Sequence, residues 1–588
     1  ILQMCGRAGR PQFDAEGRAV IMTQRHTQSA YQGLVHGTDP IESNLGRPLS
    51  EHINAEIASG VVKDTATAAH WLRHSYFFIR AKKNPRHYGV ETGTSAEEAI
   101  EALALRVIDE LADAGMCDLR DGGALVLPAQ GGIIMSDMYV RFNTMRRLMT
   151  VNQGAKVPDL LLAMSHAQEF EGIKLRKDEK KTLKEWNVSE EPIVRYKVME
   201  AKGKSGKLAV SKVIRTAAEK IFVMTQEHMC DEFDVDLPAS MRMELELVFS
   251  NGRRIMRGAA RYYSTITEGG FAACVNALRL AKSLELRMWD DTRYPMKQIA
   301  GCGKKSVRAL AANGVVSLDD VVAADPRALE RYVNRAFPHG NHLVSEVLKL
   351  PCKMLVTVAV KESWDRGAVA HVAIQRACTP RAGAAATNVP GDECDNENEN
   401  VAVTALEDEG DDALDAPSPS PPTRSSGAAG AAAGSSRWSA QLVVGTTWGD
   451  TLLHNERISQ DGGAASVENG IPIERVVPCG VVPRPGEEYQ IAARLIFEKC
   501  VGRDVAGSVK VVVPRYGRHA PLSATQPSEA SPPRALSGGR LTPQQSTPPS
   551  SLGKLRQRGL DAWLGGSGTP GGGKENREDG GDAAATLA

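Results

Sequence analysis

Ile1-Leu2-Gln3-Met4-Cys5-Gly6-Arg7-Ala8-Gly9-Arg10-Pro11 opens the chain and contains the pattern Gln-x-x-Gly-Arg-x-Gly-Arg. Arg7 and Arg10 are three residues apart, so a helical turn would place both guanidinium groups on one side. Gly6 and Gly9 precede them, and glycine lets a backbone come close to a polyphosphate. A pair of planar guanidinium groups suits the charge that develops on a transferring phosphoryl group. The pattern therefore predicts part of a nucleotide-phosphate site, and an ordinary basic turn is the alternative.

The composition limits the class of protein. The 588 residues carry 71 Lys and Arg against 71 Asp and Glu, so any nucleic-acid surface must be local. The ten cysteines form no Cys-x-x-Cys pair and no zinc-like cluster, which indicates a reducing intracellular compartment and no metal site. No apolar run approaches ~18 residues, so we expect no membrane association. The chain begins with Ile rather than Met, and we expect a fragment or an incomplete gene model.

Residues 41–130 have the pattern of a compact helical unit. Apolar spacing and capping residues predict helices over 49–57, 64–83 and 95–115, followed by a hairpin over 117–127. Three helices and a hairpin predict a winged helix. Its basic residues suggest a nucleic-acid contact, and a rigid spacer is the alternative; they are Arg73, Arg80, Lys82, Lys83 and Arg86.

Residues 131–295 are expected to be helical, and three stretches carry cationic faces. The alternative for each face is ordinary solvation. The faces lie on a helix near 173–186 (Lys177, Lys180, Lys181, Lys184), on one over 241–263 (Arg253, Arg254, Arg257, Arg261), and on one over 270–289 (Asn276, Arg279, Ser283, Arg287, with Lys282 beside them). The apolar residues of the last helix recur every three or four positions, and a polar, cationic stripe opposite them suits a single-strand backbone.

Residues 296–350 contain a second candidate phosphate contact. Gly301-Cys302-Gly303 precedes a basic helix, and such a turn exposes backbone N–H groups at a helix N-terminus. The basic residues Lys304, Lys305 and Arg308 add charge. The pattern is similar to a helix-hairpin-helix, and a tight turn between helices is the alternative.

The remaining residues change from helical to strand periodicity. Short strands are expected over 354–360, 370–375, 439–444, 490–497 and 508–513, which suggests a β-sandwich. The Ala-, Gly-, Pro- and acid-rich insert 381–436 and the Pro-, Ser- and Gly-rich tail 517–588 are expected to be disordered. Within the tail, four residues resemble a sliding-clamp-binding peptide, although an aliphatic side chain replaces the usual second aromatic: Gln557, Leu560, Trp563 and Leu564.

Gln3 to Arg10 resembles motif VI of superfamily-2 helicases. Leu49 to Ile57 and Arg80 to Gly89 resemble the winged-helix signature of large helicases with a Sec-type C-terminal domain, which include archaeal repair helicases and spliceosomal RNA helicases. Ile173 to Trp186, with its Leu-Arg-Lys-x-Glu-Lys-Lys run, is most similar to the meiotic crossover-promoting DNA helicases. The resemblance covers residues 1–350 well, the sandwich weakly, and neither the insert nor the tail.

This resemblance implies a multidomain, mainly α-helical protein. The expected domains are 1–40 (end of the second RecA-like α/β motor domain), 41–130 (winged helix), 131–200 (helical connector), 200–295 (helical bundle with a ratchet helix), 296–350 (helix-hairpin-helix), 351–516 (immunoglobulin- or fibronectin-like β-sandwich with the insert) and 517–588 (tail).

The resemblance also implies roles for individual residues. Gln3, Arg7 and Arg10 would face the γ-phosphate of ATP, with Arg10 nearest to an arginine finger and Gly6 and Gly9 completing the set. The helix over 270–289 matches the ratchet helix that lies along the translocating strand, where Arg279 and Lys282 would contact the backbone with Asn276 alongside. The family implies ATP-driven unwinding in the 3′-to-5′ direction, Mg²⁺ as the counter-ion of ATP, and a nuclear location.

The chain departs from the family pattern in one respect. It contains no Gly-x-x-x-x-Gly-Lys-Ser/Thr and no Asp-Glu-x-His, the motifs that supply the phosphate loop and the Mg²⁺-holding carboxylates. We therefore expect this polypeptide alone not to hydrolyse ATP.

Three functions stay open at this point. The first is the C-terminal part of a DNA helicase of meiotic recombination that grips single-stranded or branched DNA. The second is a non-catalytic nucleic-acid or protein-binding module, whose sandwich and tail recruit recombination proteins or a sliding clamp. The third is an RNA helicase of the spliceosomal group.

Overall fold

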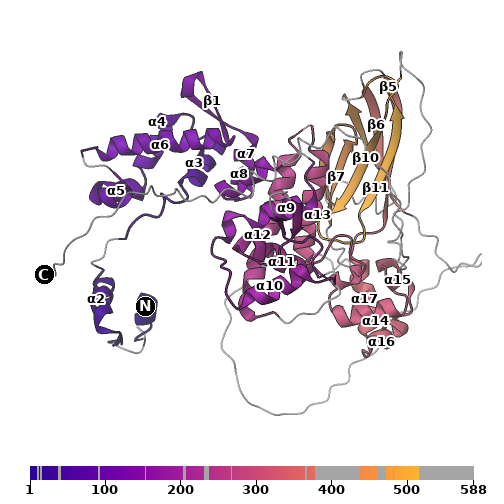
Figure 1. Cartoon of the computed structure of the whole chain (residues 1–588), viewed down its shortest axis with the longest axis horizontal. Helices are drawn as coiled ribbons and strands as arrows, with labels where there is room; N and C mark the ends of the chain where they lie inside the picture. The colour runs from indigo at the N-terminus through magenta and orange to yellow at the C-terminus, as the bar shows by residue number, and fades with distance from the viewer. Residues whose placement is uncertain are drawn as a thin grey trace, which may run out of the picture. The chain divides into compact units, whose positions relative to one another are not determined.

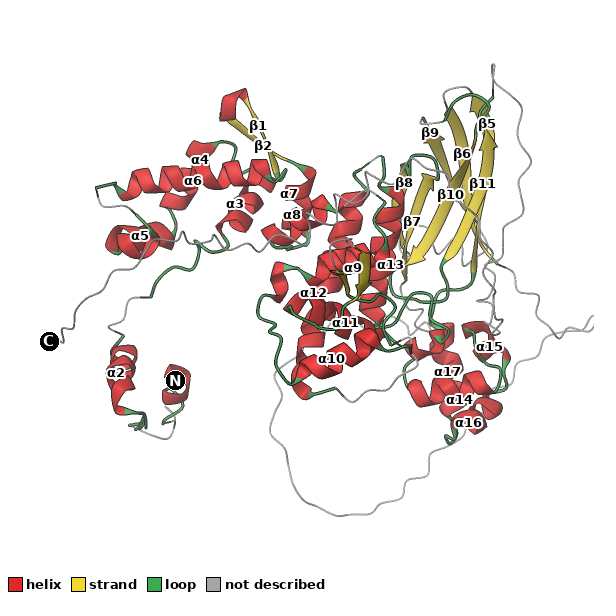
Figure 2. Cartoon of the chain, in the orientation of Figure 1, coloured by secondary structure: helices red, strands yellow, loops and turns green. Residues whose placement is uncertain are grey.

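A computed structural model of the chain is shown in Figure 1. The residues that it describes are 1–9, 12, 16–37, 41–90, 93–151, 154–191, 193–202, 207–230, 237–266, 268–364, 367–377, 438–459, 472–480 and 483–514. The insert 381–436, the tail 517–588 and the clamp-like peptide lie outside these residues. The description below follows the chain through the helices and strands coloured in Figure 2.

The first 37 residues contain the short helix α1 (Leu2–Cys5) and the helix α2 (Gln28–His36). The apolar run Ala19–Met22 has a composition typical of a buried strand, but these residues have no regular structure and Met22 is 93% exposed. A strand depends on hydrogen bonds from a neighbouring strand. No described strand pairs with this segment.

The winged-helix region has the elements expected from its sequence. They are α3 (Leu49–Ala58), α4 (Thr65–Arg73), α5 (Tyr76–Lys83), α6 (Ala96–Asp113) and the antiparallel hairpin of β1 (Cys117–Arg120) and β2 (Leu125–Pro128). Asp64 caps α4 by accepting a hydrogen bond from the Thr67 N–H at 2.7 Å. The helix expected over 64–83 is two helices, because Ser75 adopts an extended backbone and its hydroxyl donates to the Leu72 carbonyl.

A cluster of hydrogen bonds around Glu42 fastens the segment before α3 to α5. Arg80 donates to both carboxylate oxygens of Glu42, at 3.1 and 2.8 Å. Asn84 and Tyr88 donate to the same carboxylate at 2.9 and 2.7 Å. Arg80, followed by Tyr88 and Asn84, holds the pKa of Glu42 well below its usual range. Residues of the winged-helix signature therefore hold the chain that enters this region.

The next helices pack into one helical body. They are α7 (Gln130–Asp137), α8 (Phe142–Thr150), α9 (Val157–Ser165), α10 (Glu179–Val188), α11 (Ala217–Met229), α12 (Ala239–Tyr263) and α13 (Phe271–Leu286). The long helices α12 and α13 confirm the expectations over 241–263 and 270–289. α9 contacts α11, α12 and α13, so packing is continuous across the expected boundary near residue 200. A short hairpin of β3 (Met199–Lys202) and β4 (Lys207–Val210) was not expected.

A buried ion network joins α10, α11 and α12. The ammonium group of Lys220 is fully buried and lies 2.6 Å from carboxylate oxygens of both Glu179 and Glu244. Arg176 contacts the same two carboxylates at 2.8 and 3.1 Å. Burial opposes the ionisation of Glu179, but Lys220 outweighs it and holds the pKa of Glu179 below its usual value. The Arg and Glu of the Leu-Arg-Lys-x-Glu-Lys-Lys run are thus internal contacts of the body.

Beyond the body, a four-helix unit and a pair of sheets share one hydrophobic core. The helices are α14 (Lys304–Ala312), α15 (Leu318–Ala323), α16 (Pro326–Val333) and α17 (His339–Leu348). The strands are β5 (Met354–Trp364), β6 (Gly367–Arg376), β7 (Ser439–Thr446), β8 (Leu452–Ser459), β9 (Ile473–Cys479), β10 (Glu488–Phe497) and β11 (Val505–Val512). One continuous cluster of buried side chains runs from Met296 through all four helices to Val513.

The strands form two antiparallel sheets, in the orders β11-β10-β7-β8 and β5-β6-β9. Sequence periodicity predicted β5, β6, β7, β10 and β11 but missed β8 and β9. Both missed strands lie at a sheet edge. β8 has few buried side chains, and β9 contains Pro478, which a central strand would exclude.

We predict that Lys220→Met lowers the free energy of unfolding of the helical body by about 3–5 kcal/mol, because Glu179 and Glu244 would lose their buried cation. Chemical denaturation followed by tryptophan fluorescence measures the change. Lys212→Met, at an exposed lysine, is the control and should change the free energy by about 0.5 kcal/mol or less. Equal effects of the two substitutions would contradict the buried network.

The structure also predicts a pH dependence. Burial, followed by the charges of Lys297 and Arg287, lowers the pKa of His228 to about 4. The unfolded chain takes up this proton below about pH 6.5 and the folded chain only near pH 4. Stability from this group is therefore complete above pH 6.5, falls between 6.5 and 4, and is constant below. His228→Gln should flatten that part of the profile of Tm against pH, and an unchanged profile would exclude His228 as its source.

Candidate nucleic-acid interface

The residues of the opening motif lie at and after α1. Gln3, Gly6, Arg7 and Gly9 are exposed, and Gly9 has a φ of +78°, which glycine adopts without strain. Arg10 lies outside the described residues. Described side chains therefore offer an exposed guanidinium to a phosphate, but neither a phosphate loop nor carboxylates for Mg²⁺.

The N-terminus of α13 is fastened to the loop between β7 and β8. Asp450 accepts from the Ala272 N–H through its carboxylate at 2.9 Å and from the Phe271 N–H through its carbonyl at 3.2 Å. The ring of Phe271 packs directly on Gly445 of β7, where a Cβ atom would lie 2.4 Å from the ring. Acidic and carbonyl groups satisfy the exposed donors of a helix start. Figure 1 shows α13 between the other helices of the body and the sheet that contains β7 and β10.

The middle of α13 is fastened to the loop between β10 and β11. Lys282 is 1% exposed, and its ammonium group forms an ion pair with Asp504. Asp504 also accepts from the Phe497 N–H at 3.0 Å. Burial raises the pKa of Asp504, and Lys282 opposes that rise. Lys282 was expected to contact DNA, but its side chain is buried and its ammonium group pairs with Asp504 of the β10–β11 loop.

The same β10–β11 loop contacts the helical unit of α14–α17. Gln298 exchanges two hydrogen bonds with the backbone of Val501, at 2.8 and 3.0 Å. Arg503 pairs with Asp319 of α15 at 2.7 Å. One loop therefore positions both the cationic helix α13 and the glycine turn that precedes α14.

The exposed side of α13 carries the other predicted contacts. Arg279 keeps 39% of its side chain exposed while its Nε contacts Asp290 at 2.5 Å. Burial opposes the charge of Arg279, but Asp290 outweighs it and the pKa of Arg279 lies above its usual value. Asn276 donates to the Ala155 carbonyl at 2.8 Å, and Arg287 pairs with Glu246 at 2.6 Å. Arg279 is therefore a partly exposed guanidinium group that one carboxylate, that of Asp290, contacts.

Sequence reasoning missed Arg494, which lies on β10. Its neighbours on the same face of the strand, Ala492 and Ile496, are buried, whereas Arg494 is exposed. β10 contacts α13, and burial followed by the positive charge of Arg279 lowers the pKa of Arg494. Two arginines from different parts of the chain therefore lie near each other. The sequence feature that could have identified Arg494 is its position as a charged residue inside an otherwise apolar strand.

The arginines of α12 are largely neutralised by carboxylates. Arg253 and Arg257 both pair with Glu285 of α13, at 2.8 and 3.3 Å. Arg261 pairs with Asp137 at 2.8 Å, and Arg254 donates to the carbonyl of Tyr139. This face, expected as a cationic surface, instead holds α12 to its neighbours.

The glycine turn before α14 leaves open space at the start of that helix. Gly301 has a φ of +82°, and Gly303 is the N-cap residue of α14, with open space where a side chain would lie. Gly303, Lys305 and Arg308 are exposed, and Lys304 is half-buried. The structure thus brings the backbone donors and the three basic side chains of this turn together at one helix start.

The comparisons with known proteins fit these elements. The family described as the Sec63 Brl domain matches residues 128–468, which is more than half of the chain. The chain belongs to the Sec63 Brl domain family. A winged helix-turn-helix family of the SNRNP200 type matches residues 42–129, directly before the Sec63 Brl region.

Curated relatives of this Sec63 Brl protein have helicase names. It is similar to "ATP-dependent DNA helicase homolog MER3" of Arabidopsis thaliana, with 34% identity over 62% of this chain and 32% of that protein. "Probable ATP-dependent DNA helicase HFM1" of Xenopus tropicalis is 31% identical over 60% of this chain and 25% of its own length. "DExH-box ATP-dependent RNA helicase DExH14" of Arabidopsis thaliana is 28% identical over 62% of this chain and 16% of its own length. The chain thus spans about a third or less of these relatives.

The winged helix before the Sec63 Brl region offers less free charge than its sequence suggested. Arg73 pairs with Glu101, Arg80 with Glu42 and Lys82 with Glu97. Lys83 and Arg86 remain exposed.

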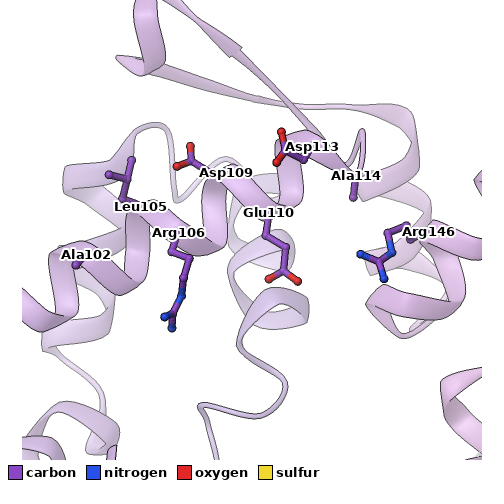
Figure 3. Close-up of a pocket in the computed structure, with 8 residues that line it drawn as sticks. All are labelled: Ala102, Leu105, Arg106, Asp109, Glu110, Asp113, Ala114 and Arg146. Atoms are coloured by element: carbon purple, nitrogen blue, oxygen red, sulfur yellow. The ribbon is translucent and has the colours of Figure 1, made fainter. Parts of the chain in front are cut away.

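A hollow of about 770 Å³ lies beside α6, with Arg146 of α8 across from it (Figure 3). Its charged lining mixes both signs: Arg106, Asp109, Glu110, Asp113 and Arg146. It contains none of the residues predicted to bind nucleotide or nucleic acid. The described residues also show no metal-like cluster of His, Cys, Asp and Glu, and no helix among them is long and apolar enough to span a bilayer.

We predict a strong coupling between Lys282 and Asp504. Lys282→Met and Asp504→Asn should each destabilise the Sec63 Brl region, because each leaves one charge without its partner. The double variant should be more stable than the sum of the single effects by about 1–3 kcal/mol. Denaturant unfolding of the four proteins measures this cycle. Additive effects, or a Lys282→Met protein of normal stability that binds single-stranded DNA weakly, would contradict a packing role.

Proposed function

We propose that this chain is the C-terminal, DNA-gripping part of an ATP-dependent helicase that unwinds DNA in the 3′-to-5′ direction during meiotic homologous recombination. Its membership of the Sec63 Brl domain family and the helicase names of its relatives support the enzyme class. The similarity of Leu175–Lys181 to the meiotic helicases supports the pathway. The observation that carries the proposal is that Arg279 of α13 and Arg494 of β10 lie near each other and are at least partly exposed.

In this proposal α13 lies along a single strand and contacts its phosphates. The helix suits that role because Asp450 and Asp504 fasten it at two places, so its exposed side chains have a fixed position. Arg279 and Arg494 supply two guanidinium groups, which bind phosphate oxygens well. Asn276 is a polar neighbour on the same helix. The turn at Gly301 and Gly303, with Lys304, Lys305 and Arg308, is a second backbone contact.

The ATP chemistry belongs to the whole enzyme in this proposal. Arg7 and Arg10, with Gln3, Gly6 and Gly9, would complete an ATP site whose phosphate loop and Mg²⁺ ligands come from other residues. Hydrolysis of ATP at that site would supply the free energy for strand movement. The 588 residues contain neither of those motifs, and we propose that this polypeptide does not hydrolyse ATP alone.

The remaining parts are proposed to attach partners. The two packed sheets suit an immunoglobulin- or fibronectin-like sandwich that contacts recombination proteins. Gln557, Leu560, Trp563 and Leu564 are proposed to bind a sliding clamp. A function in recombination places the protein in the nucleus, on DNA that is single-stranded or branched.

An RNA helicase is the second candidate, because the RNA helicase DExH14 is also similar over 62% of this chain. Contacts to a phosphate backbone alone do not separate the two nucleic acids. A DNA helicase should bind a DNA strand at least as tightly as an RNA strand of the same sequence.

We predict that Arg279→Ala with Arg494→Ala weakens binding of single-stranded DNA. The slope of log affinity against log salt should fall by about 1–1.5, because each lost phosphate contact to a single strand accounts for about 0.7. Fluorescence anisotropy of this chain at several salt concentrations measures both quantities. Arg475→Ala with Arg484→Ala, on the sandwich, is the control of equal charge. If both doubles keep the wild-type affinity and slope, α13 is not in the DNA path.

A further inference from the structure

The outer face of α10 carries lysines that the proposed function does not use. Lys177, Lys180, Lys181 and Lys184 are all exposed. Leu183 and Trp186 of the same helix are buried at 0 and 5% exposure and define its inner side. With about 100° of rotation per residue, Lys181 and Lys184 lie on the opposite side, with Lys180 at its edge. Lys177 lies in the turn two residues before the helix. We call these four residues the α10 lysine face.

Like charges on this face lie next to each other. Lys180 and Lys184 are four residues apart on the helix, and such a pair repels. Within the part of the chain that the structure describes, none of the four forms an ion pair. The basic residues of α12 and of the winged helix differ, because carboxylates neutralise most of them. Folding therefore does not account for the charge of the α10 lysine face.

The helix that carries this face is held rigidly from inside. Glu179, in its first turn, is 4% exposed and pairs with the buried Lys220. Arg176 ties the segment before the helix to Glu244 of α12. The lysines therefore have a fixed common direction, which lowers the entropy cost of binding an extended polyanion.

The chemistry of the face favours a duplex over a single strand. Ammonium groups act as point charges that bind phosphates without reading bases. Single-strand sites combine charge with exposed aromatic rings on which bases stack. The aromatic residue of α10, Trp186, is buried. From Lys180 to Lys184 the helix spans about 6 Å, close to the rise of two base pairs along a duplex.

We propose that the α10 lysine face binds the phosphate backbone of double-stranded DNA, at a site separate from the single-strand contacts of α13. This proposal rests on the proposed function as a DNA helicase. It assigns two different helices of the body to two states of the same substrate: α10 to the paired part and α13 to the separated strand.

The test compares two triple variants of this full chain. Lys177→Gln, Lys181→Gln and Lys184→Gln together remove the centre of the α10 lysine face. Lys353→Gln, Lys361→Gln and Lys499→Gln remove three exposed lysines from the sandwich and its approach, with the same change in net charge. The probes are a short blunt DNA duplex and one of its strands, each titrated between about 50 and 200 mM salt. Circular dichroism and Tm confirm that both variants remain folded.

We expect the α10 variant to bind the duplex more weakly, with a salt slope reduced by about 2–3, since each lost duplex phosphate contact accounts for about 0.9. Its binding of the single strand should match that of the sandwich variant. An unchanged duplex slope would overturn the proposal, as would an equal loss on duplex and single strand. A wild-type chain that binds the single strand but no duplex would overturn it and leave the proposed function intact. A wild-type chain that binds neither would overturn both.

Discussion

The ion pair between buried Lys282 and Asp504 connects the parts of the C-terminal half of the described structure. The ammonium group of Lys282 leaves water to form it, and a buried charge is tolerated only when its partner is in place. The pair joins the middle of α13 to the β10–β11 loop, and neighbouring residues of that loop reach Gln298 and Asp319. Helix, sandwich and glycine turn therefore depend on the same few residues. The position of α13 is therefore fixed by its contacts with the sheet that contains β10 and with the β10–β11 loop.

Sequence patterns predicted the helices well where all the buried side chains lie on one face of the helix. The three- and four-residue spacing of apolar side chains located α12 and α13, and the capping residues Asp64 and Ser95 marked the starts of α4 and α6. Helical periodicity could not show which other part of the chain packs against the polar face of a helix. Lys282 was expected to face DNA because a helical wheel shows only its own helix, and Asp504 lies more than two hundred residues further along the chain.

The same limit applies to the site residues that were missed or overestimated. Arg494 lies inside an apolar strand, and only the packing of β10 on α13 brings it near Arg279. The α12 arginines appeared as a stripe in the sequence, but their partners Glu285 and Asp137 lie on other helices. Strand β8 was missed because few of its side chains are buried, and β9 was missed because it contains Pro478. The environment of these arginines depends on residues far away in the sequence, which local sequence patterns do not reveal.

The connection between β6 and β7 has a consequence for how this protein can vary. These strands belong to different sheets, and residues 377–438 join them. The entropy of closing a loop grows only with the logarithm of its length, at about 0.6 kcal/mol for each doubling. Residues can therefore be added or lost at this connection with little effect on the stability of the two sheets. The length of the chain between β6 and β7 can therefore change during evolution while the sheets, and the helix α13 that contacts them, keep their structure.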